Sequence, residues 1–321
     1  MKVFSIRGGI FASSIALALL LVACATPQHS NRPAPPPISV NQTTTNASAS
    51  SSRAAHLPTS FSFPALQNSS RQQIVNRVTW GVMPASLQQT QNLGVNQYLS
   101  QQLRASPPQL PSAIQAQIDA MRVTQTPLLK LMQDLERVRI NADQNTASKE
   151  DAKKDYQQEM HALAREAASR SLLRSLYSEQ QLQEQMVSFW MNHFNIHHGK
   201  HNVRAMLGDF EEHAIRPFAL GRFQDLLHAT ATHPAMLRYL DNEHNAANKI
   251  NENYARELME LHTMGVNGGY SQRDVQELAR VLTGVGISIN PDSPRMKPQF
   301  ERLYVRQGMF EFNPLRHDFG A

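Results

Sequence analysis

The chain contains a single cysteine, Cys24, among its 321 residues. One thiol excludes an intramolecular disulfide in any cellular compartment. The sequence also lacks the paired cysteines and the His-Glu-x-x-His pattern of zinc sites, the Walker phosphate loop, the glycine triplet of dinucleotide-binding folds and the Gly-x-Ser-x-Gly elbow of serine hydrolases. No reaction can therefore be assigned from a motif.

The chain also has little net charge and no apolar run of membrane-spanning length. The formal net charge is +5, and it falls to +3 without Lys2 and Arg7, which lie in a segment expected to be removed. This charge is too small to indicate a nucleic-acid partner. The longest mainly apolar run, Ile10–Ala23, is shorter than the ~20 residues of a transmembrane helix.

The N-terminal segment has the features of an export signal. Lys2 and Arg7 precede the apolar run Ile10–Ala23, which ends in the sequence LVAC. This ending resembles the lipobox of bacterial lipoproteins, and the resemblance implies cleavage before Cys24 and acylation of its thiol. Residues 1–23 are thus predicted to be a signal peptide, and lipid chains are predicted to hold the mature protein on a membrane of the cell envelope. Ala25, in place of an aspartate, favours the periplasmic face of the outer membrane.

Residues 24–60 are rich in Pro, Ser, Thr and Asn, as in RPAPPPISVNQTTTNASASSSRAA. A segment with so few large apolar side chains cannot bury enough surface to offset the entropy of ordering, which predicts a disordered tether. In residues 61–321 apolar side chains recur at helical spacing. This pattern predicts a mainly α-helical domain.

Two long amphipathic segments, from Pro127 to Ile140 and from Lys149 to Tyr177, predict a helical hairpin. Their Lys, Glu and Arg side chains are expected to face solvent. Strand-like alternation occurs only near the C-terminus, in VGISI and MFEFN, and predicts a small β-hairpin at most.

Three helix starts are predicted from capping residues. Ser70 precedes the apolar stripe of RQQIVNRV, and Ser178 with Gln181 precedes the stripe of QMVSFWMNHF. Ser271 with Asp274 has the spacing of a capping box for the helix QRDVQELARVL.

Four stretches carry a resemblance to a known family: MVSFWMNHF, RPFALGRFQDLLHATATHPAMLRYLDN, NENYARELMELHTMGVNGGYSQRDVQELARVLTG and FNPLRHD. In this order and spacing they resemble the bacterial family of the domain of unknown function eighteen hundred, over roughly residues 70 to 321. The resemblance implies a largely α-helical, exported protein. It implies no established activity, substrate or cofactor.

The chain departs from the family pattern in two places. Val285 stands where members usually have a tryptophan, and the family domain normally continues well beyond the His317-Asp318 pair. The resemblance therefore implies a domain truncated at its C-terminus, in which a pocket between two halves would be open or missing.

The segment from Asn251 to Ser271 is unusually dense in hydrogen-bonding side chains. On a helical wheel Glu252, Arg256 and Glu260 share one side and can pair at i, i+4 spacing. Two interpretations stay open: surface ion pairs on an amphipathic helix, or a network enclosed by neighbouring loops, which could be structural or could bind a ligand. The candidate residues are Asn192, His193, Asp241, Asn242, Asn251, Glu252, Asn253, Arg256, Glu257, Glu260 and His262.

A second cluster, NHFNIHHGKH, spaces His193, His197 and His201 four residues apart. Two histidines at this spacing on a helix can ligate a zinc-like metal if a third histidine or a carboxylate, such as Glu257, Glu260 or Asp241, converges on it. Alternatively Gly199 ends the helix, and the histidines near its C-terminus complement the helix dipole.

The loop after HPAMLRYL carries Asp241, Asn242, Glu243 and His244, in which a carboxylate beside the histidine could act with it as acid and base. Capping and turn formation are the simpler role for such residues.

Three functional hypotheses follow. The first is a lipid-anchored envelope protein, not an enzyme, that binds a protein or polysaccharide partner through a polar crevice. The second is a metal-dependent hydrolase using His193 and His197 with nearby carboxylates. The third is a truncated, inactive relic. No nucleic-acid partner is expected.

The lipobox prediction can be tested by replacing Cys24 with serine, which removes the thiol that would be acylated. We expect Cys24→Ser to move the protein from the membrane to the soluble fraction, measured by immunoblotting after fractionation. Ser48→Ala, in the predicted tether, serves as the control and should stay with the membrane. Continued membrane attachment of Cys24→Ser would contradict the prediction.

Overall fold

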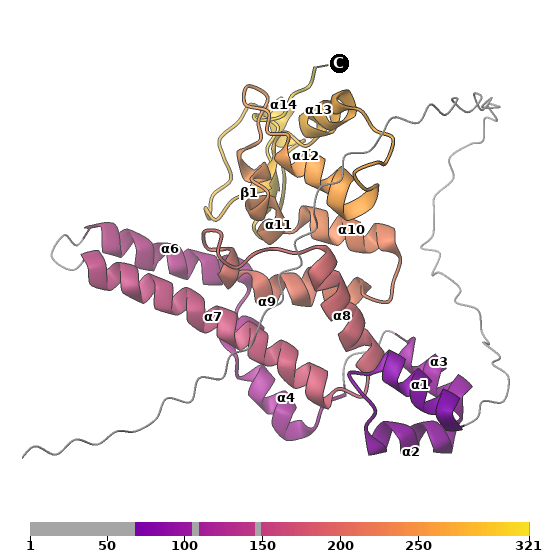
Figure 1. Cartoon of the computed structure of the whole chain (residues 1–321). Helices are drawn as coiled ribbons and strands as arrows, with labels where there is room; N and C mark the ends of the chain where they lie inside the picture. The colour runs from indigo at the N-terminus through magenta and orange to yellow at the C-terminus, as the bar shows by residue number, and fades with distance from the viewer. Residues whose placement is uncertain (1–67, 105–108, 145–148, 321) are drawn as a thin grey trace, which may run out of the picture. The chain divides into compact units, whose positions relative to one another are not determined.

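The computed structural model describes residues 68–104, 109–144 and 149–320, shown in colour in Figure 1. Contacts divide the chain into Met1–His56 and Leu57–Ala321, and every described residue belongs to the second unit. The predicted signal peptide, the lipidated Cys24 and the tether lie outside the described residues. Within the described residues, no helix combines the length and the apolar character needed to cross a bilayer.

The described part of the chain is mainly α-helical, as predicted, with a small sheet near its end. Its α-helices are α1 (Asn68–Val78), α2 (Pro84–Leu93), α3 (Val95–Gln102), α4 (Ser112–Asp119), α5 (Arg122–Gln125), α6 (Leu128–Gln144), α7 (Lys149–Tyr177), α8 (Gln181–His193), α9 (Leu207–Asp209), α10 (Phe223–Thr232), α11 (Pro234–Tyr239), α12 (Asn253–Glu257), α13 (Gln272–Val281) and α14 (Pro298–Glu301). Short 3-10 turns are η1 (Val203–Ala205), η3 (Arg216–Phe218) and η4 (Asn242–His244), and π-helical turns are η2 (Phe210–Ile215) and η5 (Leu258–Thr263). The strands are β1 (Val285–Ile287), β2 (Val305–Gln307) and β3 (Phe310–Phe312).

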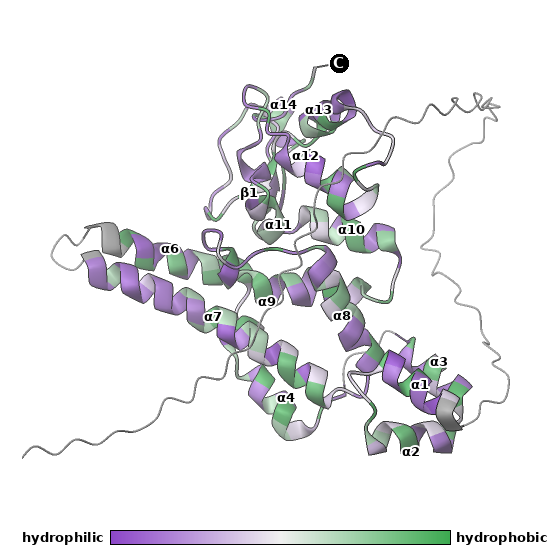
Figure 2. Cartoon of the chain, in the orientation of Figure 1, coloured by the Kyte–Doolittle hydropathy of each residue, from purple (hydrophilic) through white to green (hydrophobic). Residues whose placement is uncertain are grey.

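The predicted helical hairpin is confirmed: α6 and α7 pack side by side in Figure 1. Residues at helical spacing place one apolar stripe of each helix toward the other and toward the main core. The buried stripe residues are Leu128, Leu131, Met132, Leu135, Met160, Leu163 and Ala167. In Figure 2 the first half of α7 is mostly hydrophilic, and hydrophobic residues are mixed with hydrophilic ones toward its other end.

One of the three predicted helix starts is confirmed. Ser271 and Asp274 form a complete capping box at α13, in which each side chain bonds the other residue's backbone N–H. Ser178 does not cap α8, because its Oγ accepts from the N–H of Gln180, and the helix begins at Gln181 without a side-chain cap. The start predicted at Ser70 is also wrong, since α1 already begins at Asn68.

The sheet has three antiparallel strands in the order β1-β3-β2. The two segments predicted to pair do so, with Val285 opposite Phe312 and Ile287 opposite Phe310. No sequence pattern indicated β2, which forms a hairpin with β3 through Gly308, where φ is +59°. The residue before β1 is Gly284, at φ +79°, and a Cβ added there would lie 2.6 Å from the carbonyl oxygen of Asn313. That close approach requires glycine.

A buried ion-pair network joins α7, α8 and η2. Arg216 is 5% exposed and donates to both carboxylate oxygens of Glu184 at 2.8 and 3.0 Å, and to Glu211 at 2.8 Å. Burial by itself would lower the pKa of the Arg216 guanidinium, but the hydrogen bonds and charges of the two glutamates raise it overall. The guanidinium of Arg216 is therefore ionised in the interior.

Two arginines of α7 extend this network, contrary to the expectation that the charges of that helix face solvent. Arg174 pairs with Glu212 through two hydrogen bonds, and Arg170 donates to the Gly208 carbonyl at 2.5 Å and to Val123 at 3.2 Å. Burial would raise the pKa of Glu212, but the hydrogen bond and charge of Arg174 lower it overall. These arginines fix η2 and the start of α5 against α7.

Removing one carboxylate from the network should destabilise the fold strongly. We expect Glu184→Leu to lower the free energy of unfolding by about 3–5 kcal/mol, because Arg216 then loses two of its three charge-assisted hydrogen bonds while it stays buried. Urea titration followed by circular dichroism measures the change. Glu277→Leu is the control, since its ion pair with Arg280 is exposed and contributes about 0.2–1 kcal/mol. Equal effects of the two substitutions would contradict this account.

Candidate functional site

The asparagines of the predicted polar network connect loops of the fold to each other. Asn242 is fully buried and donates to the carbonyls of Leu282 and Val285, while Asn245 donates to Ala279. The side chain of Asn251 donates to the Asp241 carbonyl, and that of Asn253 donates to the Leu240 carbonyl. Their partners are backbone groups of residues 240–285, so these amides hold the loop between α11 and α12 in place.

Asp241 does not pair with His244. Its backbone is in the left-handed region, at φ +63°, and its carboxylate accepts a hydrogen bond from Lys200 at 2.7 Å. His244 lies instead 4.0 Å from the carboxylate of Glu243, which is held by Arg238. At 4.0 Å the carboxylate of Glu243 is beyond hydrogen-bond distance of His244, so the acid–base pair considered for this loop is not hydrogen-bonded.

The charged residues of the predicted site form a half-exposed network between α12 and α13. Glu252 accepts from Arg256 at 3.1 Å and from Gln272 of α13 at 2.6 Å, and Arg256 lies 3.6 Å from Glu260. Side-chain exposure of the three ionic groups is 26 to 36%, so solvent screens both ion pairs and their contribution to stability is small. Glu257, at the end of α12, is half-buried. The network fastens α12 to α13 and leaves its outer side in water.

His193 and His262 meet where η5 packs against the end of α8. The Nε2 atom of His193 lies 3.1 Å from the His262 carbonyl oxygen, and the two rings are 6.3 Å apart. His193 also contacts the rings of Trp190 and Phe223, whereas its neighbour Asn192 is exposed. His262 is 6% exposed, and burial lowers its pKa to about 4, with the nearby His193 adding to the effect.

The histidine run does not share one helix. Because α8 ends at His193, neither His197 nor His201 continues its face, and Gly199 lies beyond the point where the helix already stops. The Nδ1 atom of His197 accepts from the N–H of Gly199, and His201 is an exposed residue at φ +45°. In residues 68–104, 109–144 and 149–320, no three His, Cys, Asp or Glu side chains come together as metal ligands.

The buried neutral imidazole of His262 predicts a pH-dependent stability. An unfolded histidine binds a proton below pH 6.5, whereas His262 in the folded protein does so only near pH 4. The neutral His262 side chain therefore contributes fully to the free energy of unfolding above pH 6.5, and this contribution is lost as the pH falls toward 4. We expect His262→Leu to flatten the decrease in unfolding free energy over this range, measured by urea titration at several pH values. His198→Leu, at an exposed histidine, should keep the wild-type slope, and an unchanged slope in His262→Leu would contradict the assignment.

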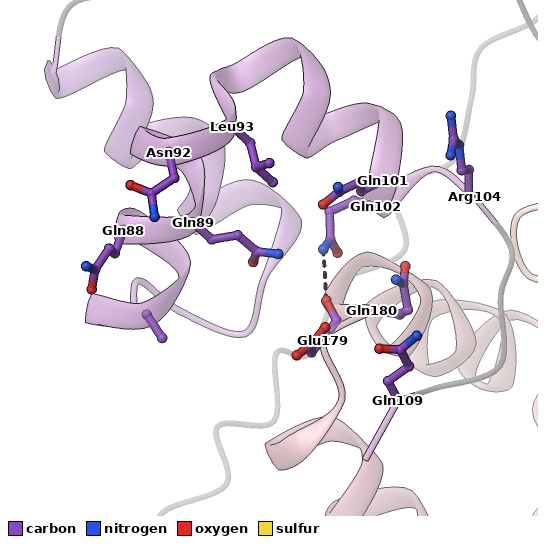
Figure 3. A pocket seen from close by; sticks show the side chains of 11 residues that line it. Gln88, Gln89, Asn92, Leu93, Gln101, Gln102, Arg104, Gln109, Glu179 and Gln180 are labelled. Carbon is purple, nitrogen blue, oxygen red and sulfur yellow. Dashed lines mark hydrogen bonds between the residues drawn. The ribbon is translucent and has the colours of Figure 1, made fainter. Parts of the chain in front are cut away.

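A further pocket formed by described residues lies elsewhere, between α2, α3 and the turn that joins α7 to α8 (Figure 3). Its volume is about 800 Å³, and seven of its eleven lining residues carry side-chain amides. The lining residues are Ala85, Gln88, Gln89, Asn92, Leu93, Gln101, Gln102, Arg104, Gln109, Glu179 and Gln180. We call it the amide pocket.

Gln102 fixes the two walls of the amide pocket relative to each other. It is 2% exposed, its Nε2 donates to the Glu179 carbonyl at 2.8 Å, and its Oε1 accepts from the N–H of Leu182 at 3.1 Å. Figure 3 shows Gln89 of α2 directed across the pocket toward the side that carries Gln180. The Oε1 atom of Gln180 is buried and has no hydrogen-bond partner within the described part of the chain.

The sequence contained a signal for this pocket that was missed. Six of its seven amides come from three short runs, SLQQTQN, SQQLR and EQQ, each of which reads alone as a solvated helix surface or a turn, and the seventh is Gln109. Only the folding of α2 and α3 against the start of α8 brings the runs together.

Comparison with known families agrees with the motifs on α8, α12 and α13. The family model described as "Protein of unknown function (DUF1800)" matches residues 73–321, most of the chain. The chain belongs to this family. Neither a search of curated proteins nor a search of solved structures finds a match. DUF1800 membership thus places the described domain in a family without assigning it a reaction, and the functional argument depends on the geometry of this chain.

Proposed function

We propose that this DUF1800 protein is a lipid-anchored envelope protein that binds peptidoglycan through the amide pocket. The observation that carries the proposal is the lining: seven amide side chains around a pocket of about 800 Å³ that is open to solvent. Its ionisable lining residues are one cation, Arg104, and one anion, Glu179.

The chemistry of the lining favours a polymer that is itself rich in amides. Each Gln or Asn side chain offers two N–H donors and one carbonyl acceptor, which can pair with both halves of another amide. Peptidoglycan carries amides in its acetamido sugars and in its peptide stems. The balanced charge of the lining argues against a strongly acidic or basic polymer.

The unpaired oxygen of Gln180 supports a ligand with N–H donors. A buried acceptor without a partner costs about 1–3 kcal/mol, and a donor from a ligand recovers that free energy. Gln102, by contrast, uses both ends of its side chain within the protein. We assign Gln102 to holding the pocket open and Gln180 to the ligand.

The predicted location of the protein is a compartment that contains this ligand. A chain anchored by lipid at Cys24 and tethered through residues 24–60 would place the folded domain in the periplasm, where peptidoglycan lies. Lipid attachment also confines many copies of the protein to a thin layer. Weak binding by the one amide pocket of each copy is then sufficient to hold the copies on peptidoglycan.

Co-sedimentation of the purified protein with peptidoglycan sacculi tests the proposal. We expect wild-type protein to sediment with sacculi, and the double variant Gln89→Ala/Gln101→Ala to bind at least tenfold more weakly. Loss of hydrogen bonds at about 0.5–1.5 kcal/mol each accounts for this factor.

The matched control is Gln91→Ala/Gln97→Ala, which removes two exposed amides of the same helices α2 and α3 outside the pocket. This variant should bind like wild type. If wild-type protein fails to sediment, or if both double variants lose binding equally, the amide pocket is not a peptidoglycan site.

A further inference from the structure

A second pocket, of about 460 Å³, contains a chain of hydrogen bonds that ends at a solvent-exposed histidine. Asp209 of α9 lies between two imidazoles: His213 Nδ1 is 2.9 Å from Oδ1, and His233 Nε2 is 2.9 Å from Oδ2. All three residues line the pocket. Because an ionised carboxylate can only accept hydrogen bonds, both contacting ring nitrogens carry a proton.

The orientation of Asp209 is set from the buried side. His233 is 7% exposed, and its Nδ1 accepts from the N–H of Ala235 at 3.1 Å, so its Nε2–H is directed at the carboxylate. Burial would raise the pKa of Asp209, but hydrogen bonds from His213 and His233 lower it overall. The carboxylate is therefore ionised and fixed on both oxygens.

The outer imidazole has the properties of a general base. The side chain of His213 is 68% exposed, and with its Nδ1 proton bound to Asp209, its Nε2 carries the lone pair. A carboxylate on Nδ1 holds the tautomer and stabilises the imidazolium formed when Nε2 takes a proton.

The walls of the pocket are mostly apolar. They are formed by the start of α6, by α10 and by the turn between β2 and β3, which leaves room for an apolar group beside the imidazole. The apolar lining residues are Pro127, Leu128, Leu129, Phe218, Ala229, Pro234, Met309 and Phe310.

We propose that this pocket hydrolyses carboxylic esters that carry a short apolar acyl chain. Nε2 of His213 removes a proton from water as the water oxygen bonds to the acyl carbon, and the carbonyl electron pair moves to its oxygen. When that pair re-forms the carbonyl, the bond from the acyl carbon to the alcohol oxygen breaks. The leaving alkoxide takes the proton from His213, which gives an acid and an alcohol and regenerates the base.

The charged surroundings of His213 set the expected pH dependence. Its hydrogen bond to Asp209 raises the pKa of His213 above the usual value, burial opposes this, and Glu212 adds to the rise while Arg170 of α7 reduces it. His228 of α10 and His233 face the same pocket. Since the neutral ring is the base, the rate should increase with pH up to a plateau.

Hydrolysis of p-nitrophenyl butyrate by the full-length chain tests the proposal. We expect kcat/KM to fall about 100-fold in His213→Gln, the range that general-base catalysis supplies. His244→Gln is the matched control, because that side chain is 66% exposed and also lies beside a glutamate, outside the pocket. It should change kcat/KM less than twofold. Equal losses in the two variants, or a wild-type rate no higher than that of free imidazole at the same concentration, would overturn the proposal.

Two further measurements separate catalysis from structure. Asp209→Asn should lower the plateau rate and shift the midpoint of the pH–rate profile to lower pH, because the carboxylate no longer raises the pKa of His213. An unshifted midpoint in a folded variant overturns the role given to Asp209. Ala229→Phe narrows the apolar wall and should raise KM for the butyrate ester more than for the acetate ester. Equal effects on both esters place the reaction outside this pocket.

Discussion

The side chain of Arg216 is the buried charge on which the rest of this fold depends. It lies between the carboxylates of Glu184 and Glu211, and the three side chains are 2 to 8% exposed. A charge left without its partner in such an interior costs several kcal/mol, so any packing of α8 and η2 that separates these groups is strongly disfavoured. We infer that the network selects one arrangement of these elements, which apolar packing alone would leave less determined.

Both candidate sites are built on that arrangement. Glu184 lies in the first turn of α8, directly after the turn that supplies Glu179 and Gln180 to the amide pocket. On the other side, the π-helical turn η2 directs Glu211 and Glu212 into the ionic network and leaves the next residue, His213, at the surface. A π-helix has a wider turn than an α-helix, so the residues of the next turn are shifted by about one position. This shift allows both Glu211 and Glu212 to point into the interior. The same buried charges therefore position one wall of the amide pocket and the imidazole proposed as a base.

The structural elements that could be predicted from the sequence are those whose interacting residues lie close together in the chain. The α6–α7 hairpin and the capping box of Ser271 follow from spacing alone, because their apolar stripes and side-chain partners lie a few residues apart. The arginines of α7 could not be separated from a solvated face in this way. Their partners, Gly208 and Glu212, are 38 positions away, and only the folded chain brings them within hydrogen-bond distance.

A high density of polar side chains in the sequence marked segments rich in hydrogen bonds. It did not show whether those side chains bond to the protein's own backbone or remain available to a ligand. In residues 240–253 the backbone is mostly irregular, so many of its carbonyls have no partner from helix or sheet, and the side chains of Asn251 and Asn253 supply the missing donors. In α2 and α3 the helical backbone already bonds to itself, so glutamines such as Gln89 are not required for that purpose. The regularity of the backbone, more than the number of amides, therefore decides which of them remain for a ligand. By that criterion we propose the amide pocket of α2 and α3 as the binding surface, whereas the segment from Asn251 to His262 supports the fold of the domain.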